Sequence, residues 1–206
     1  SNGVWYILGS RDGFWGVAFG FGTDKPVAGD YDGDGKTDIA VFRDGIWYIQ
    51  QSRDGFLGIS FGQAGDIPQP GDYDGDGKDD IAVFRPSTGI WFILGSRDGF
   101  FAQTFGASTD KPMRGDYDGD GKTDVAVFRD GIWHILRSRE GYMGVAFGFG
   151  TDKPVPADYD GDGKADITVY RDGTWHTLES SKSESASYRA VQFGDGFDIP
   201  IPAALQ

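Results

Sequence analysis

The chain has 206 residues, of which 38% are hydrophobic, and this is enough for one packed globular domain. Its formal charge of −13 and the lack of any Lys/Arg run argue against a nucleic-acid partner, and no apolar run approaches the roughly 20 residues of a membrane helix. The lack of cysteine excludes disulfides and thiol chemistry, whereas 34 glycines favour many short strands and tight turns.

A unit of about 42 residues repeats along the whole chain. Five tryptophans open the related runs WYIL, WYIQ, WFIL, WHIL and WHTL, with spacings of 42, 44, 42 and 42 residues. Phe-Gly pairs recur with the same period. The tryptophans are Trp5, Trp47, Trp91, Trp133 and Trp175, and the Phe-Gly pairs begin at Phe19, Phe61, Phe105, Phe147 and Phe193. Repeats of this length are typical of propellers and solenoids.

Each unit is predicted to contain four short strands separated by turn residues. In the first full unit they are PVAGDY from Pro26, DIAVFR from Asp38, IWYIQ from Ile46 and FLGISFG from Phe56. The second strand is apolar on both faces, as a sheet covered on both sides requires. We therefore predict an all-β fold, a β-propeller of about five four-stranded blades in 42–44-residue repeats. A β-sandwich or an open β-solenoid is the alternative.

The expected blades fill residues 1–206 as one domain, with boundaries near 24–64, 65–108, 109–150 and 151–196, and a fifth blade from 197–206 plus 1–23. The sequence contains five copies each of the expected first, third and fourth strands, but only four second strands and four acidic loops. The last blade would thus be shared between the N- and C-termini and lack one strand. Three alternatives remain for it: a longer array, a strand supplied in trans, or a tolerated gap.

Four acidic loops connect the first and second strands, and they predict about four Ca²⁺ sites. Each places Asp at positions 1, 3, 5 and 9 with glycines between, and alternating Asp residues on a curled backbone direct their oxygens to one centre. The carbonyl at position 7 is the expected further ligand. The predicted ligands are Asp30, Asp32, Asp34, Lys36, Asp38; Asp72, Asp74, Asp76, Lys78, Asp80; Asp116, Asp118, Asp120, Lys122, Asp124; and Asp158, Asp160, Asp162, Lys164, Asp166.

The loops differ from EF-hands, because position 12 is valine where an EF-hand has a bidentate Glu. The alternative is a simple Asp-Gly turn, for which one acidic residue would suffice. Sixteen of the 32 acidic residues occupy these positions, so four Ca²⁺ ions would change the formal charge from −13 to −5. If each site were filled to about 100 times its Kd, four sites would add roughly 11 kcal/mol to folding. Calcium would then be structural, which favours an extracellular or cell-surface location.

The Phe-Gly pairs and the loops DYDGDGKTD, DYDGDGKDD and DYDGDGKAD, each running into DIAVF, DVAVF or DITVY, resemble the FG-GAP/VCBS repeat family of integrin α-chain heads and secreted bacterial proteins. The resemblance covers essentially all of the chain. It implies a propeller with Ca²⁺ in the hairpin between the first two strands. Val41-Phe42-Arg43 replaces the Gly-Ala-Pro half of the motif, as in bacterial members, so integrin-type ligand recognition is not implied.

Catalysis is not expected, because the chain has two histidines, no cysteine and no nucleophile motif, and Ca²⁺ ligands must stay ionised. His134 and His176 follow the repeated Trp where other units have Tyr6, Tyr48 and Phe92, so we expect them to fill space. We assign no catalytic residue and predict a non-enzymatic binding or adhesion module.

The fourth strand of each unit opens with an aromatic residue, and the preceding turn carries arginine. Exposed aromatics could stack on sugar faces while the arginines donate hydrogen bonds, as in a lectin; packing between blades is the alternative. The candidates are Phe14, Phe56, Phe100, Tyr142, Tyr188, Arg11, Arg53, Arg97 and Arg139. The partner would be a glycan or a cell-surface or matrix protein. The alternative function is an assembly subunit that self-associates or docks through its incomplete blade and outer strands.

Overall fold

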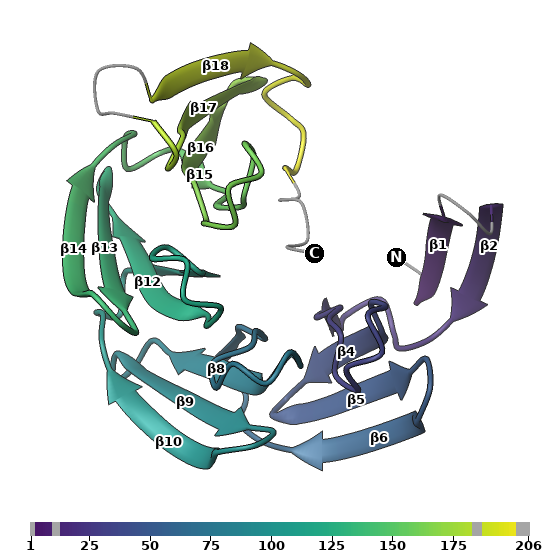
Figure 1. Cartoon of the computed structure of the whole chain (residues 1–206). Helices are drawn as coiled ribbons and strands as arrows, with labels where there is room; N and C mark the ends of the chain where they lie inside the picture. The colour runs from purple at the N-terminus through teal and green to yellow at the C-terminus, as the bar shows by residue number, and fades with distance from the viewer. Residues whose placement is uncertain (1–2, 10–12, 183–186, 201–206) are drawn as a thin grey trace.

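The structure is a computed structural model that describes residues 3–9, 13–182 and 187–200. Its 18 strands form four four-stranded sheets and one two-stranded sheet, and these residues contain no helix. The sheets are arranged like blades around a common centre (Figure 1). The prediction of an all-β propeller is therefore confirmed.

The blades follow one another in chain order. The two-stranded sheet consists of β1 (Val4–Gly9) and β2 (Gly13–Ala18). Blade 1 contains β3 (Lys25–Pro26), β4 (Ile39–Arg43), β5 (Ile46–Gln51) and β6 (Gly55–Ser60). Blade 2 contains β7 (Ile67–Pro68), β8 (Ile81–Arg85), β9 (Ile90–Gly95) and β10 (Gly99–Thr104). Blade 3 contains β11 (Lys111–Gly115), β12 (Asp124–Arg129), β13 (Ile132–Arg137) and β14 (Gly141–Ala146). Blade 4 contains β15 (Lys153–Pro154), β16 (Ile167–Arg171), β17 (Thr174–Leu178) and β18 (Tyr188–Gln192).

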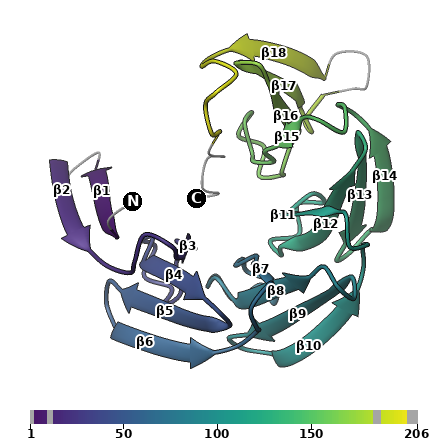
Figure 2. The same ribbon diagram turned by 180° about the vertical axis from the view of Figure 1, so that it is seen from behind.

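Each blade is an antiparallel meander whose strands pair in chain order. The first strand and its loop lie on the inner side of the arc, and the fourth strand lies on the outer rim, as both views show (Figures 1 and 2). The first strand is only two residues long in blades 1, 2 and 4, where a single bridge such as Gly29↔Asp38 closes the base of the acidic loop. The loops are thereby held near the centre of the fold.

The hydrophobic core lies between the blades. Ala40, Phe42, Trp47 and Ile49 of blade 1 pack against the second strand of blade 2, and the same arrangement recurs between blades 2 and 3 and between blades 3 and 4. Burial on both faces explains the continuous apolar run of each second strand. Trp47, Trp91 and Trp133 are fully buried, whereas Trp5 and Trp175 are half-buried.

The Phe-Gly pairs fix the outer strand to the repeated tryptophan. In each unit the indole Nε1 donates to the carbonyl of the Phe, for instance from Trp91 to Phe105 at 2.9 Å. The glycine that follows, Gly106, has a φ of +121°, and a Cβ there would lie 3.1 Å from Val127 and 3.2 Å from Phe84. A residue without a side chain is therefore required where the chain crosses to the next blade.

The prediction of about five blades is corrected to four complete blades in the described residues, with β1 and β2 as the two-stranded remainder. The physical reason is that the first two strands of a blade are built around an acidic loop, and the sequence has four such loops. The predicted pairing of the C-terminal strand with β1 and β2 falls mainly on 201–206 and lies outside the described residues. Within the described part of the chain, no helix is long and apolar enough to cross a membrane.

Candidate metal sites and an interblade pocket

Each acidic loop is curled by hydrogen bonds from its own backbone. The carboxylate of Asp30 accepts from the amide nitrogens of Gly33 at 2.7 Å and Gly35 at 2.8 Å. These glycines have φ values of +73° and +80°, a conformation that other residues adopt at a cost. The Gly-Asp-Gly pattern therefore turns the loop back on its first residue.

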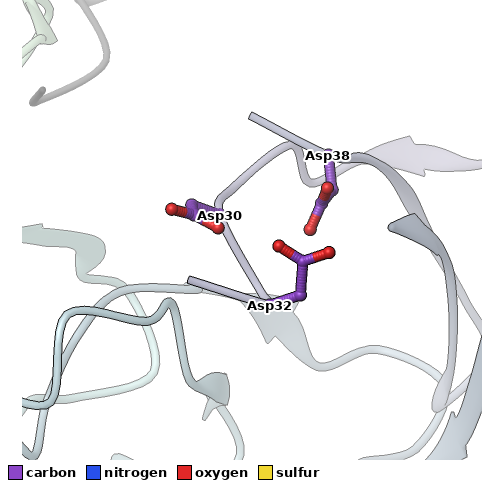
Figure 3. A group of neighbouring side chains, drawn as sticks. All are labelled: Asp30, Asp32 and Asp38. Carbon is purple, nitrogen blue, oxygen red and sulfur yellow. The ribbon is translucent and has the colours of Figure 1, made fainter. Parts of the chain in front are cut away.

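Three carboxylates of each loop converge. Oxygen atoms from positions 1, 3 and 9 lie within 4.8 Å of one another in all four loops. Figure 3 shows the three side chains in blade 1, with the carboxylates of Asp32 and Asp38 facing each other. The groups are Asp30, Asp32, Asp38; Asp72, Asp74, Asp80; Asp116, Asp118, Asp124; and Asp158, Asp160, Asp166. An all-oxygen donor set of this kind can hold a hard metal cation.

The aspartate at position 5 lies outside these three-residue groups. In blade 1, the carboxylate of Asp34 accepts from Ser52 Oγ at 2.7 Å and from the backbone nitrogen of Lys36 at 2.9 Å. These hydrogen bonds lower the pKa of Asp34, with the bond from Ser52 as the largest cause. Its role as a ligand, and that of the position 7 carbonyls, stays a prediction.

The turn between the third and fourth strands donates hydrogen bonds to each acidic loop. The backbone nitrogen of Ser52 donates to Asp38 at 2.7 Å, and that of Arg53 donates to Asp32 at 2.9 Å. The guanidinium of Arg53 also donates to the carbonyl of Asp32. Arg97 and Arg139 make the equivalent contacts in blades 2 and 3. The structure thus places these predicted ligand-binding arginines at the acidic loops, while Arg11 lies outside the described residues.

The sequence signal for this support was the recurrence of Ser-Arg in the turn. The sequence prediction grouped the arginine of this turn with the aromatic residue of the fourth strand, because the two are close in the chain. The contact with the loop joins residues 21 positions apart, as in Arg53 and Asp32, and only the paired strands bring them together.

Two features of the acidic clusters are compatible with a bound cation. Asp74 Oδ1 and Asp118 Oδ1 are buried without a hydrogen-bond partner, although the other oxygen of each carboxylate accepts from a backbone nitrogen of the turn. Burial raises the pKa of Asp80 and Asp124 to about 6, mainly because a buried carboxylate loses hydration. A cation among these oxygens would satisfy the unpaired atoms and keep the carboxylates ionised.

Neighbouring loops are bonded to each other around the centre. The residue at position 8 of one loop donates its backbone N–H to the carbonyl of position 1 in the preceding loop, with distances of 2.7, 2.6 and 2.6 Å. The pairs are Asp79 to Asp30, Thr123 to Asp72 and Ala165 to Asp116. Each candidate metal site is therefore part of the contact between two blades.

The predicted ring of outer aromatics is exposed and also touches the preceding blade. Phe14, Phe56, Phe100, Tyr142 and Tyr188 are between 57 and 70% exposed. Three of them make edge contacts with the Phe of a Phe-Gly pair, with centroid distances of 6.2 to 6.4 Å: Phe100 with Phe61, Tyr142 with Phe105, and Tyr188 with Phe147. These aromatic side chains are thus largely exposed, and three of them also pack against the preceding blade, so each of the two interpretations describes part of their environment.

A pocket of about 280 Å³ lies where the segment that follows β2 meets blade 1. Phe19, Phe21, Arg43, Tyr48 and Phe56 line it, together with Gly20 and Val41. The guanidinium carbon of Arg43 is 4.3 Å from the ring centroid of Phe21 and 4.8 Å from that of Tyr48. The pocket combines aromatic walls with a cationic donor, and of the sequence candidates it contains Phe56.

The guanidinium in this pocket is held in place by a buried carboxylate. Arg43 Nε and Nη2 each donate to Asp24 at 2.6 Å, and the Asp24 side chain is 1% exposed. The hydrogen bonds from Arg43 are the main reason that the pKa of Asp24 is lowered. The other amine, Nη1, has no acceptor among the described residues and remains available to a ligand.

The histidines occupy the Tyr48 position in blades 3 and 4. The ring nitrogen Nδ1 of His134 lies 2.9 Å from Tyr142 Oη, and that of His176 lies 2.9 Å from Tyr188 Oη. Each ring stacks on its tyrosine with a centroid distance of 6.2 Å. The histidines thus pack beside the outer aromatics, as the sequence interpretation expected.

Comparisons with known proteins agree with this geometry. Residues 30–83, 72–127 and 116–169 match the family described as FG-GAP-like repeat. No curated protein matches the chain. Among solved structures, the chain is similar to a lectin of Agrocybe aegerita whose structure concerns specific recognition of non-reducing terminal N-acetylglucosamine, with a TM-score of 0.58 and 18% identity. The match covers 90% of this chain and 59% of the lectin chain, and at this identity it shows the fold.

Proposed function

Because the chain belongs to the FG-GAP-like repeat family, we propose that it is a calcium-stabilised extracellular propeller that binds carbohydrate and catalyses no reaction. Calcium stabilises the blades, and the interblade pocket binds the ligand. The two sites are separate in the fold, since the acidic loops lie on its inner side and the pocket involves the outer strand.

Calcium is the ion that best suits the acidic loops. Each loop offers carboxylate oxygens, with further carbonyl and carboxylate oxygens nearby in the same loop, and Ca²⁺ accepts six to eight such ligands in flexible geometry. Mg²⁺ prefers a smaller octahedral shell and keeps several waters. The unpaired Asp74 Oδ1 and Asp118 Oδ1 would face the ion. A stabilising role in calcium-rich surroundings supports the extracellular location.

The observation that carries the binding proposal is the fixed guanidinium between aromatic rings. Arg43 is held by Asp24, so ordering it costs little on binding, and its free Nη1 can donate to a hydroxyl or an acetamido carbonyl. Phe21 and Phe56 are 66% and 63% exposed, and their rings can receive the apolar face of a sugar. A pocket of about 280 Å³ suits a single terminal sugar unit.

Terminal N-acetylglucosamine is the first ligand that we propose. Its acetamido group supplies the carbonyl that Arg43 can bind and a methyl group for the aromatic walls. The lectin of similar fold supports this choice, because its printed description concerns this sugar. Enzymatic activity is not proposed, since both histidines are paired with tyrosines and the pocket holds no acid–base pair.

A glycan array in calcium tests the proposal directly. The wild-type protein should bind glycans that end in N-acetylglucosamine, and Phe56→Ala and Tyr48→Ala should weaken binding at the pocket at least tenfold. Phe197→Ala is the matched control, because this ring is 97% exposed and lies outside the pocket. Binding of no glycan, or equal binding by the wild type and both pocket variants, would contradict the proposal.

A second candidate function is assembly through the two-stranded sheet. β1 and β2 form two strands where each blade has four, and Tyr6, Leu8 and Phe14 of this sheet are 68, 81 and 70% exposed. Exposed apolar side chains on a sheet favour association. Light scattering in calcium distinguishes the two candidates: a mass near 22.4 kDa favours ligand binding by a monomer, whereas concentration-dependent dimers or polymers that Leu8→Lys abolishes favour assembly.

A further inference from the structure

The sequence positions that line the interblade pocket recur at three further blade junctions, and we call the four sets of residues grooves 1 to 4, numbered by the blade that supplies the arginine. Groove 1 is the pocket described above. In the other grooves Arg85, Arg129 and Arg171 take the place of Arg43, and each makes the same paired hydrogen bonds to a buried aspartate. The donor is thus conserved through the internal repeat, so it does not distinguish the grooves.

Two of the lining positions change in kind between the grooves. The position of Tyr48 holds Phe92 in groove 2, where its half-buried ring lies 4.3 Å from the guanidinium carbon of Arg85, and it holds histidine in grooves 3 and 4. The second position groups groove 1 with groove 4. The residue two places after the Phe of the Phe-Gly pair is Phe21 in groove 1, Gln63 in groove 2, Ala107 in groove 3 and Phe149 in groove 4. Phe149 repeats the contact of Phe21, because the guanidinium carbon of Arg171 lies 4.1 Å from its ring centroid. Phe21 and Phe149 are also similarly exposed, at 66 and 62%.

Grooves 1 and 4 therefore present two exposed rings beside the arginine, and grooves 2 and 3 present one. In groove 4 the second ring is Tyr188, which is 57% exposed. In grooves 2 and 3 the outer ring is Phe100 or Tyr142, and the position that corresponds to Phe21 holds no aromatic residue. A sugar held between two rings excludes more water from its hydrogen bond to the guanidinium than a sugar on one ring.

We propose that grooves 1 and 4 are the carbohydrate-binding sites, that Phe21 and Phe149 determine this, and that the protein is bivalent. This inference rests on the proposed function and specifies how many carbohydrate-binding sites the protein has. The two grooves lie at well-separated blade junctions of the arc, one beside β1–β2 and the other between blades 3 and 4 (Figure 1). Such spacing suits glycans that are displayed many times on one surface, where two weak sites gain avidity.

The test resolves the grooves individually. N-acetylglucosamine is titrated into ¹⁵N-labelled protein in calcium, and amide shifts are followed at the glycines of the Phe-Gly pairs: Gly20, Gly62, Gly106 and Gly148. We expect saturable shifts at Gly20 and Gly148 only. Phe21→Ala should weaken the affinity measured at Gly20 at least tenfold and leave the affinity measured at Gly148 unchanged. Phe149→Ala should weaken the affinity at Gly148 and leave that at Gly20 unchanged.

Matched variants separate binding from folding. Phe100→Ala and Tyr142→Ala truncate equally exposed rings in grooves 2 and 3 and should leave both responses unchanged. Ala107→Phe should create a third response at Gly106. Because Phe21 and Phe149 are largely exposed, their truncation should leave the unfolding midpoint unchanged, which a purely structural role would not predict.

The outcomes separate the two hypotheses. Saturable shifts in all four grooves, or in groove 2 or 3 alone, would overturn the bivalent assignment and leave the proposed function in place. Unchanged affinity in both Phe21→Ala and Phe149→Ala would also overturn it. No shift in any groove would instead overturn the proposed carbohydrate function itself, and the bivalent assignment with it.

Discussion

Replacing Arg129 with methionine should destabilise the protein far more than its exposed position suggests. Arg129 Nε and Nη2 donate to Asp110 at 2.5 and 2.6 Å, and the Asp110 side chain is 0% exposed. After Arg129→Met, this buried carboxylate keeps only the backbone nitrogen of Ala107 as a donor, at 2.8 Å. Removing one partner of a buried ion pair typically costs about 3–5 kcal/mol, because the remaining charge is left uncompensated.

The magnitude can be measured by urea unfolding in excess calcium. With an m-value of about 3 kcal/mol/M, a loss of 3–5 kcal/mol lowers the urea midpoint by roughly 1–1.7 M. Adding Asp110→Asn should recover much of the loss, because the amide still accepts from Ala107 and carries no charge. A double variant that is as unstable as Arg129→Met alone, or a single variant that loses less than about 1 kcal/mol, would refute the uncompensated charge as the cause.

Three further predictions concern the core, acid and the loops. Trp91→Ala should lower the free energy of unfolding by about 3–5 kcal/mol, and Trp175→Ala should lower it by clearly less, because only Trp91 is fully buried. Urea unfolding compares the two variants, and equal losses would contradict the role of Trp91 in the core between blades. Burial raises the pKa of Asp110, but the hydrogen bonds from Arg129 and Ala107 and the charge of Arg129 together lower it below 3.8. The pair therefore stabilises the fold above that pH, and the contribution is lost as the pH falls through the lowered value. The stability advantage of wild type over the Asp110→Asn/Arg129→Met double variant should shrink below pH 3.8, and a constant difference would argue against the linkage. A Cβ at Gly77 would meet no atom within 4 Å, but Gly77→Ala places alanine at a φ of +87°, so it should cost about 1–2 kcal/mol of stability through backbone strain alone. It should also weaken calcium binding at that loop in a calorimetric titration. Unchanged stability and affinity would show that the loop can adopt another backbone conformation.

The local features of this fold were predictable from the sequence. The strands around Ile39, Ile46 and Phe56 were expected within a residue or two, because apolar runs bounded by Asp-Gly turns leave little choice of structure. The alternation that separates Ala40 and Phe42 from Val41 follows from the period of a strand, and the core clusters confirm it. The acidic clusters depend on local loop geometry and were likewise expected.

Features that depend on the contact between blades were not predictable in the same way. Arg53 was assigned to the outer aromatic ring, yet the structure joins it to Asp32 through the pairing of strands. The pocket at Arg43 combines residues of two successive units, and its partner Asp24 is 19 positions away. Whether β1 and β2 are completed to a further blade depends on how the ends of the repeat array pair, which one repeat unit does not determine.

Calcium is the ion proposed to stabilise the blades, and thermal unfolding with and without calcium tests this role directly. Melting should be followed in excess calcium, after chelation, and after calcium is restored, with bound calcium counted by elemental analysis. We expect about four ions per chain and, at roughly 100-fold saturation, a combined stabilisation of roughly 11 kcal/mol that chelation removes and calcium restores. Equal melting temperatures with calcium and with chelator, or no bound calcium, would contradict the account.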